Sequence, residues 1–266
     1  MPELARIPDG IHTSTPSSAR VYDYLLGGKD NYAVDRMVAE RLLSVAPDAQ
    51  AVARANRAFL ARAVRHAASQ GIRQYVDLGA GLPTSPSVHE IAREAAPGAR
   101  VVYVDNDPLV KVHNDAMPIV DDHVITLQHD VRRPEAILGD PALQAVIDEG
   151  EPVAVLFLGV LHFISDAEGA YDIVATWRDG MAPGSHVIIS NTTAHSDPEA
   201  LARLTMATAG SPAQATFRSH DELVRFFDGF TLAEPGLVPV QEWRPAVEAP
   251  AVQTRVVVEG GVGVLS

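Results

Sequence analysis

Asp77 stands at the end of an apolar run, just ahead of a loop that contains Gly79, Ala80 and Gly81. Glycines allow a ligand to approach the backbone closely, and the start of a following helix offers free N–H groups. In open α/β sheets, ligands bind beyond the carboxyl ends of the strands. An acid at this point can orient the loop amides or receive a ligand ammonium, directly or through water. Taken alone, a glycine pair at this point is more often an ordinary strand-to-helix turn.

Two further acids, Asp105 and Asp130, stand where the next two apolar runs end. Asp105, followed by Asn106, lies about twenty residues past the glycine loop, where an acid can accept hydrogen bonds from two ribose hydroxyls. Asp130 can accept from an adenine amino group while the N–H of Val131 donates to a ring nitrogen. Singly, Asp105 could be a helix cap and Asp130 a loop acid. In this order, at successive strand ends, the three acids predict an adenosine ligand.

The residues after Gly81 discriminate between two adenosine ligands. A dinucleotide needs a third glycine, G-x-G-x-x-G, because its pyrophosphate sits on the helix N-terminus. Thr84 occupies that position, and Asp77 would lie unfavourably close to the pyrophosphate. S-adenosylmethionine (SAM) carries no phosphate, and its ammonium and sulfonium suit nearby acids. The sequence therefore predicts SAM as the cofactor, with S-adenosylhomocysteine (SAH) as the product.

These acids must be positioned by an alternation of strands and helices that begins after Gly71. Several of the strand-like runs are continuously apolar, which is typical of strands buried on both faces of a parallel sheet. The alternation predicts a doubly wound, Rossmann-like α/β sheet with right-handed crossovers. Strands are expected at residues 74–78, 100–104, 124–128, 153–158 and 185–190, and helices at 88–95, 108–116, 134–148 and 167–181.

The C-terminal part lacks long helices. A short helix is expected at residues 221–227, followed by strand-like segments at 230–232, 237–240 and 254–258. Strands joined without a crossover helix pair antiparallel, so the last strand should be antiparallel to the rest. Gly260 and Gly261 predict a turn or a fraying end.

The N-terminal part is helical. Residues 1–16 are irregular, and apolar periodicity predicts helices from residue 33 to just before Pro47 and over 48–69. We therefore expect residues 1–70 to form an extension packed on a SAM-binding domain at 71–266. In the second helix the arginines are expected to form a solvated face; they are Arg54, Arg57, Arg62 and Arg65.

The segment 20–32 combines aromatic and charged residues with a Gly27-Gly28 pair. One interpretation is a lid that closes over SAM, with Arg20 or Lys29 offered to the SAM carboxylate and Tyr22 nearby. The alternative is a capped turn between helices, with the tyrosines packed on the core.

His162 follows the fourth expected strand, close to Gly159, where the loop should border both cofactor and acceptor. Histidine can act as a general base near neutral pH, although a structural role is the alternative. Methyl transfer depends mainly on in-line positioning, so no protein nucleophile is expected. The other histidines lack metal-ligand spacing, and no metal is predicted.

The 266-residue chain has a net charge of −13 and no cysteine. Such acidity disfavours nucleic-acid binding, and the absence of cysteine excludes thiolate metal sites and cysteine nucleophiles. No apolar run reaches membrane-spanning length, and the N-terminus lacks the apolar stretch of a signal peptide. We therefore expect a cytoplasmic protein with no membrane association, acting on a small-molecule substrate. The sequence leaves the oligomeric state open.

These residues make the chain resemble the class I SAM-dependent methyltransferases. Asp77 to Gly81 resembles their glycine motif, Asp105 their ribose acid and Asp130 their adenine acid. More narrowly, it resembles the bacterial S-adenosyl methyltransferase family known as DUF574. The matching segments are residues 16–32, 77–84 with His89-Glu90, and 103–108. The resemblance implies the class I fold with an added N-terminal helical segment, and it names no substrate. Pro83 departs from the wider class, which has its third glycine there.

Three functions are compatible with an adenosine site of this kind. The first is a SAM-dependent methyltransferase acting on an O or N atom of a metabolite. The second is a SAM-binding sensor or scaffold without transferase activity. The third is a nicotinamide oxidoreductase, which the glycine loop disfavours.

Overall fold

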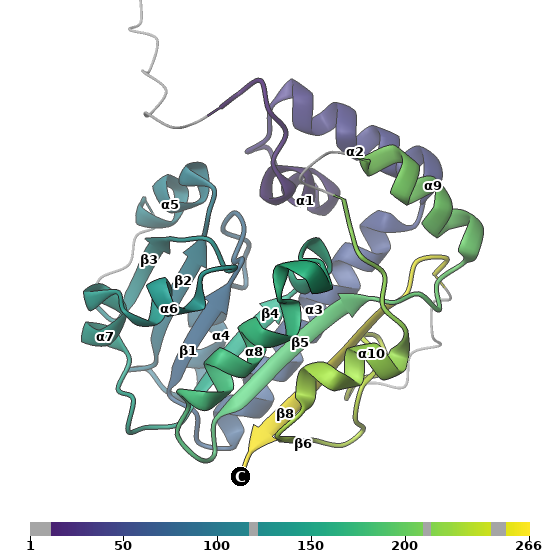
Figure 1. Cartoon of the computed structure of the whole chain (residues 1–266). Helices are drawn as coiled ribbons and strands as arrows, with labels where there is room; N and C mark the ends of the chain where they lie inside the picture. Colours follow the sequence, from purple (N-terminus) through teal and green to yellow (C-terminus); the bar gives the residue numbers. More distant parts are fainter. Residues whose placement is uncertain (1–11, 117–121, 210–213, 246–253) are drawn as a thin grey trace, which may run out of the picture.

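The structure is a computed structural model, and it describes residues 12–116, 122–209, 214–245 and 254–266. Its centre is one eight-stranded sheet in the order β3-β2-β1-β4-β5-β8-β6, with β7 also pairing with β8 (Figure 1). The first five strands are parallel, and β8 runs antiparallel to β5, as predicted for the class I fold. The strands are β1 (Gln74–Leu78), β2 (Arg100–Asp105), β3 (Val124–Gln128), β4 (Val153–Leu158), β5 (His186–Thr192), β6 (Phe230–Leu232), β7 (Val238–Pro239) and β8 (Val258–Leu265).

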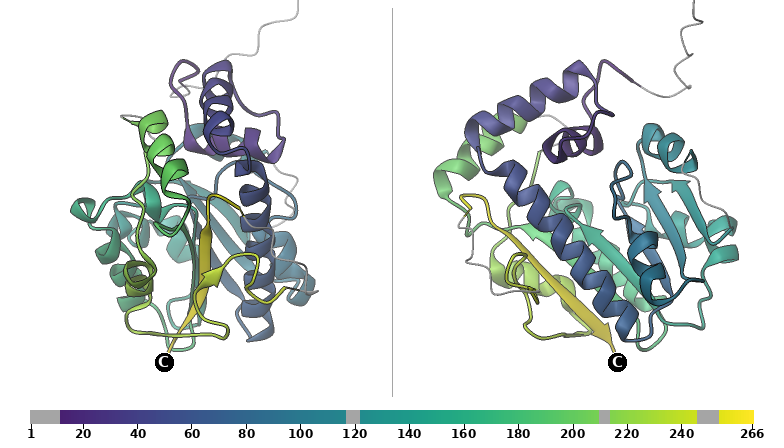
Figure 2. Two further views of the ribbon diagram at one scale, coloured as in Figure 1. Left: turned by 90° about the vertical axis from the view of Figure 1, so that its right-hand side faces the viewer. Right: turned by 180° about the vertical axis from the view of Figure 1, so that it is seen from behind.

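Helices cover both faces of this sheet (Figures 1 and 2). On one face α3 buries an i, i+3/i+4 stripe that includes Phe59, Leu60 and Val64. The other face carries α8, and its Trp177 is buried in a second apolar cluster. The helices are α1 (Ser18–Leu26), α2 (Ala33–Val45), α3 (Ala49–Ser69), α4 (Val88–Ala95), α5 (Pro108–Asp115), α6 (Pro134–Leu138), α7 (Pro141–Val146), α8 (Ala170–Asp179), α9 (Pro198–Thr208) and α10 (His220–Val224), with short 3₁₀ turns η1 (Leu161–Phe163), η2 (Asp166–Glu168) and η3 (Arg225–Phe227).

Three helices, α1, α2 and α9, lie above the carboxyl ends of the strands and form what we call the cap (Figure 1). The first two pack on each other through a small apolar cluster that includes Val21, Leu25 and Ala39. By contrast α3, although part of the expected N-terminal extension, shares the main core with the sheet. The cap roofs the edge where the predicted site lies, and α9 joins it to the main core through the buried Ala200.

The predicted turn at Gly260 and Gly261 is wrong, because both residues lie inside the eight-residue strand β8. A Cβ at Gly260 would come within 2.8 Å of the Phe59 ring, and one at Gly263 within 2.8 Å of the Phe230 Cβ. The glycines thus provide space for neighbouring side chains in a central strand, where they do not terminate it.

The last strand was expected at residues 254–258 and lies at 258–265, and two expected helices are each interrupted. The helix expected at 134–148 is two helices, because Asp140 caps a new one at Pro141, and proline is tolerated in a first turn but not mid-helix. Gly169, at a φ of 79°, likewise separates η2 from α8 within the expected helix 167–181. The helix α9 was not predicted.

Candidate active site

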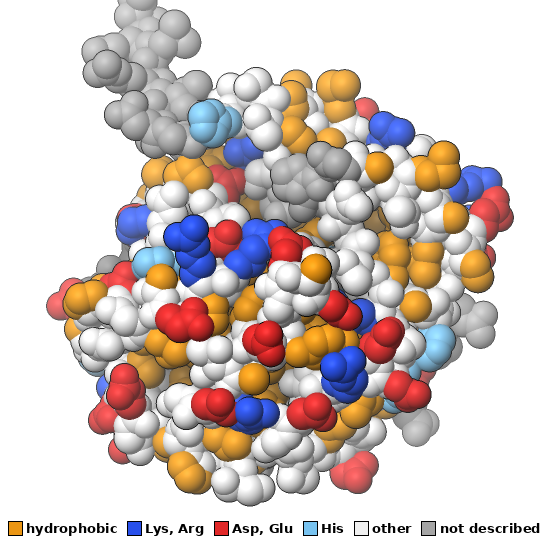
Figure 3. Space-filling view, in the orientation of Figure 1, with side chains coloured by type: hydrophobic (Ala, Val, Ile, Leu, Met, Phe, Trp, Pro, Cys, Tyr) orange, Lys and Arg blue, Asp and Glu red, His pale blue; other side chains and the backbone are white. Residues whose placement is uncertain are grey.

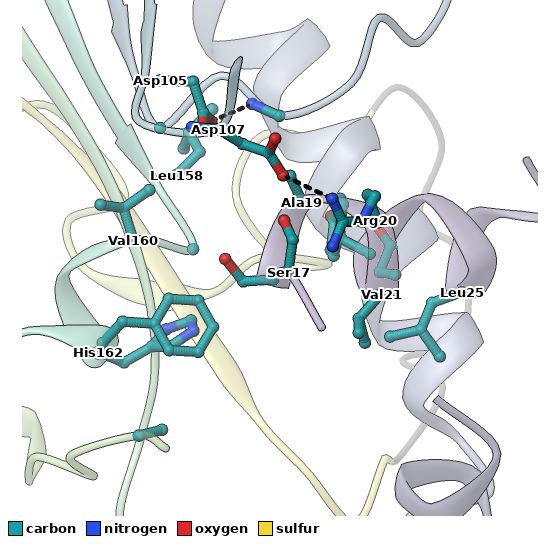
Figure 4. A pocket seen from close by; sticks show the side chains of 18 of the residues that line it. Ser17, Ala19, Arg20, Val21, Leu25, Asp105, Asp107, Leu158, Val160 and His162 are labelled. Carbon is teal, nitrogen blue, oxygen red and sulfur yellow. Dashed lines mark hydrogen bonds and ion pairs between the residues drawn. The ribbon is translucent and has the colours of Figure 1, made fainter. Parts of the chain in front are cut away.

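A cavity of about 700 Å³ lies between the strand ends and the cap, which is within the ~300–1,000 Å³ range typical of small-molecule sites. It extends from the cap helix α1, with Arg20 and Val21, across to His162 on the opposite wall (Figure 4). Nearly all the predicted site residues line it: Arg20, Tyr22, Asp77, Gly79, Ala80, Gly81, Asp105, Asn106, Asp130, Val131, Gly159 and His162. Lys29 does not; it is exposed in the loop between α1 and α2.

The glycine loop turns sharply at the end of β1. The N–H groups of Gly79 and Ala80 both donate to the carbonyl of Val104, at 2.8 and 3.1 Å. Gly79 has a φ of 72°, and a Cβ there would lie 2.2 Å from Cγ2 of Val160. Gly81, at a φ of 67°, faces open space, with no heavy atom within 4 Å of a built Cβ. The loop therefore leaves room for a ligand directly over its backbone.

Asp105 is the last residue of β2, and its carboxylate binds the glycine loop. Its Oδ2 accepts from the N–H of Gly81 at 2.9 Å, and its Oδ1 accepts from the N–H of Asp107 at 2.9 Å. The cap of α5 is Asp107, whose Oδ1 accepts from Leu109 N–H at 2.9 Å. Asp105 is thus not the cap of this helix. Burial raises the pKa of its carboxyl above the usual range.

Asp77 is buried at the floor of the cavity, and this burial raises its pKa to about 7. The guanidinium of Arg57 opposes that shift, while the nearby carboxylate of Asp105 adds to it. A cationic ligand group beside Asp77 would stabilise its ionised form in the same way as Arg57 does.

Arg57 is a site residue that the sequence interpretation placed wrongly on a solvated face. It lines the cavity, and its Nη2 donates to the carbonyls of Thr84 and Pro86 at 2.9 and 2.7 Å. The helical periodicity could have revealed this position, because Arg57 lies between Ala53 and Leu60 on the same face of α3, and both of these residues are buried.

The solvated-face interpretation is also wrong for Arg62, which donates to the carbonyl of Trp243 at 2.7 Å. It holds for Arg54, which is exposed, and for Arg65, which forms a half-exposed pair with Glu94.

Arg20 is buried between the cap and the sheet. Its Nε donates to Oδ2 of Asp35 at 2.8 Å, and its Nη1 lies 3.5 Å from Oδ2 of Asp107. The guanidinium also sits over the Tyr32 ring, 5.2 Å from its centroid. Tyr22, from the same helix, donates its hydroxyl to the carbonyl of Ala53 at 3.1 Å.

The Gly27-Gly28 pair ends α1. Gly27 has a φ of 88°, and the N–H of Gly28 donates to the carbonyl of Asp23 at 2.9 Å. A Cβ at Gly28 would overlap the carboxylate of Asp23, at 1.9 Å from Oδ1. The same carboxylate accepts from the N–H of Asp30 at 3.0 Å, so it holds the loop that leads to α2.

Asp130 follows β3 at the far end of the cavity and is partly exposed. Its Oδ1 accepts from the N–H of Arg132 at 3.0 Å, and its Oδ2 lies 3.3 Å from the Arg132 guanidinium. The neighbouring Val131 also lines the cavity.

His162 lies in η1, on the wall opposite the cap helix α1 (Figure 4). Its Nδ1 is 3.0 Å from Oδ1 of Asn191, an acceptor, so Nδ1 carries the proton and Nε2 carries the lone pair. Burial lowers the pKa of His162 to about 4, and the positive charge of Arg218 acts in the same direction. The imidazole is therefore neutral at physiological pH.

Arg218 is fully buried and holds the turn that carries His162. It donates to the carbonyls of Leu161 and Ile164 at 3.0 and 2.7 Å. Within the described residues, no group of three or more His, Asp or Glu side chains is arranged to hold a metal ion. None of the described helices combines the length and apolarity required to cross a bilayer.

Comparisons with known proteins show the family of this chain. A model of the S-adenosyl methyltransferase family matches residues 5–266. The chain belongs to the S-adenosyl methyltransferase family. It is thus a SAM-dependent methyltransferase, as the acids at the strand ends predicted. A search of curated proteins found no match.

Two crystal structures are similar over almost the whole length of this methyltransferase. A candidate methyltransferase from Thermobifida fusca YX shares 36% identity, covering 98% of this chain and 99% of that one, with a TM-score of 0.92. A DUF574 family protein from Streptomyces avermitilis MA-4680 shares 36% identity, covering 96% and 99%, with a TM-score of 0.91. An O-methyltransferase family protein from Burkholderia thailandensis, 14% identical over 82% and 60% of the chains with a TM-score of 0.50, shares the fold.

Proposed function

We propose that this methyltransferase binds SAM across the ends of β1, β2 and β3 and transfers its methyl group to a small-molecule acceptor. The ribose hydroxyls are assigned to Asp105, with Asn106 beside them, and the adenine to Asp130 and the N–H of Val131. This assignment is supported by the cavity, because all of these residues line it together with Gly81, which faces open space.

The methionine end is assigned to the floor beside Asp77. Its ammonium would face the Asp77 carboxylate, and its carboxylate would lie toward Arg57, which lines the same part of the cavity. Arg20 and Tyr22 are proposed to close over the cofactor from the cap. Lys29 is left out of this assignment because it is exposed and does not line the cavity.

SAM, when bound, supplies an electrophilic methyl group on a sulfonium. The chain holds the acceptor in line with it and excludes water, and these two effects can account for most of the catalysis. His162, neutral and with its Nε2 lone pair unprotonated, is proposed to accept the proton that the acceptor loses. Gly159 leaves space between this base and the cofactor, because a built Cβ there would already lie in van der Waals contact with Cε1 of His162, at 3.8 Å.

We further propose that the N-terminal part of the cap, residues 18–45 with α1 and α2, opens and closes over the cavity while α3 stays with the sheet. The basis is that α1 and α2 pack in a small apolar cluster to which α3 contributes Ala53, whereas most of the buried side chains of α3 lie in the main core. A cytoplasmic enzyme without nucleic-acid partners fits the net charge of −13 and the mixture of acidic and basic side chains on the face in Figure 3.

The observation that carries the cofactor assignment is Asp77 buried under a two-glycine loop. SAM and SAH should therefore raise the melting temperature, whereas NAD and NADP should not. Ligand at ~100 times its dissociation constant stabilises by about 2.7 kcal/mol. A thermal shift with NAD and none with SAM would overturn the assignment.

A further inference from the structure

The cavity has two chemically different halves. The cofactor half contains the ionisable acids and arginines, and it lies over β1 to β3. The other half, which we call the acceptor chamber, lies between α2, α3 and α9 of one wall and the ends of β5 and β8. Its lining residues are Leu42, Ala46, Ala49, Val52, Thr192, Leu204, Thr208, Ala215, Phe217, Val256 and Val258.

No described residue of the acceptor chamber is charged. Its two hydroxyl groups belong to Thr192 and Thr208, and the Thr208 hydroxyl already donates to the carbonyl of Leu204 within α9, at 2.8 Å. Transferring an unpaired charge into apolar surroundings is strongly unfavourable. The chamber therefore rejects phosphorylated, carboxylated or cationic bodies, in contrast to the cofactor half.

His162 stands at the boundary of the two halves. Its partner Asn191 directly precedes Thr192 of the chamber wall on β5. Its own carbonyl accepts from the N–H of Thr216 at 2.7 Å, between the chamber residues Ala215 and Phe217. His162 thus lies where the chamber meets the cofactor half.

We infer that the acceptor is a neutral, largely apolar molecule that places its body in the acceptor chamber and one hydroxyl at His162. This inference rests on the proposed function. The hydroxyl proton passes to Nε2 as the O–CH₃ bond forms and the S–CH₃ bond breaks. An un-ionised hydroxyl needs such a proton acceptor, and the chamber offers no other described group for that role.

Matched probes with and without a charge test this inference. Calorimetry with SAH-saturated protein should show 2-naphthol binding at least tenfold tighter than 2-naphthyl phosphate, because the ester keeps the naphthalene body and replaces the neutral hydroxyl by an anionic group. Equal or tighter binding of the phosphate would overturn the inference, and so would failure of both probes to bind the SAH complex.

A variant pair then locates the binding. Leu204→Lys adds a cation to the chamber wall at a partly exposed position. It should lower the affinity for 2-naphthol at least fivefold and reduce the ratio of the 2-naphthol affinity to the 2-naphthyl phosphate affinity. Met206→Lys, on the same helix and 75% exposed, is the matched control and should change neither probe. An unchanged preference in Leu204→Lys would place the probe elsewhere and overturn the inference.

The two proposals fail separately in this design. SAH affinity is measured in the same titrations, and 2-naphthol is also titrated into SAH-free protein. If the protein binds 2-naphthol but does not bind SAH, the proposed function is refuted. If it binds SAH but binds the two probes equally well, only the proposed acceptor class is refuted.

Discussion

The guanidinium of Arg20 lies 3.5 Å from the carboxylate of Asp107, so the first helix of the chain is paired with the residue that caps α5 (Figure 4). The Asp107 oxygen that faces Arg20 has no hydrogen-bond partner among the described residues. This ion pair joins the cap to the end of β2, two residues from Asp105, the proposed ribose acid. It is therefore a contact that would have to break if the cap opened.

The first prediction concerns this contact. Asp107→Asn keeps a good helix cap but removes the charge facing Arg20, so hydrogen exchange over residues 18–32 should become faster in the ligand-free protein. In the wild type, SAH should slow exchange there more than in α3, because ligand contacts must exceed the ordering cost of a closing cap. Exchange is measured by mass spectrometry with and without SAH.

Asp115→Asn is the control for this prediction, since Asp115 lies on the same helix and forms a half-exposed pair with Lys111. It should leave exchange in the cap unchanged. Equal protection of residues 18–32 with and without SAH would instead support a static capped turn held by Asp23.

The second prediction concerns the ribose acid. Asp105→Asn retains one acceptor oxygen for the loop but weakens the pairing with two hydroxyls, so SAH affinity should fall by about 10- to 100-fold, or roughly 1–3 kcal/mol. Isothermal calorimetry gives the affinity, and thermal unfolding checks that the variant is folded. Asp115→Asn again serves as the control. Unchanged affinity in folded Asp105→Asn protein would confine Asp105 to a structural role.

The third prediction follows from the pKa of Asp77, which burial raises to about 7. Below that pH the carboxyl is protonated, and a ligand ammonium favours its ionised form. SAH affinity should therefore rise between pH 5.5 and 7.5, by up to about tenfold per pH unit, with release of a proton. Calorimetry in two buffers of different ionisation enthalpy measures that proton.

In Asp77→Asn this pH dependence should disappear. The ligand-free protein provides an independent check, because a folded pKa above the unfolded value means that stability falls as pH rises from about 4 to about 7. Asp77→Asn should remove that fall and be more stable than wild type at pH 8 by roughly 1–3 kcal/mol. Parallel slopes for the two proteins would show that Asp77 is not the titrating group.

The fourth prediction concerns the protonation of His162. Burial lowers its pKa to about 4, so its imidazole should stay neutral above pH 5, with the proton on Nδ1. Nitrogen-15 NMR of the histidine rings reports both the tautomer and the titration, and His162→Gln assigns the signal. A midpoint near 6.5 would contradict the lowering of the pKa by burial, and a proton on Nε2 would contradict the proposed base.

The same shift has a consequence for stability. Because the unfolded state binds the proton more readily than the folded state, His162 should make the protein less stable as pH falls from about 6.5 to about 4. In His162→Gln this part of the acid destabilisation should be absent. Chemical denaturation at several pH values measures the difference.

The parts of the fold that were predictable are those with local signals. The bounds of β1, β3 and β4 match the expected ones, because a run of apolar residues between polar turns defines a buried strand without reference to its neighbours. The acids Asp77 and Asp105 were recognisable for the same reason, since each directly ends or follows such a run.

What could not be predicted depends on segments far apart in the chain. The glycines of β8 look like a turn until Phe59 and Phe230 are known to pack against them. Likewise the acceptor chamber is formed by α2, α9 and β8, and no single stretch of sequence contains its shape. Lys29 directly follows the Gly27-Gly28 pair, yet its place in the sequence does not specify which side of the loop its side chain occupies.

The close approach of Gly79 to Val160 has an evolutionary consequence. Two independent constraints require glycine at position 79: its φ of 72°, and the 2.2 Å that would separate a Cβ from the valine methyl. A smaller residue at position 160 would relieve the collision but not the backbone conformation. Descendants of this sequence can therefore vary at 160 while 79 remains fixed, so the two positions should show no covariation even though they are in contact.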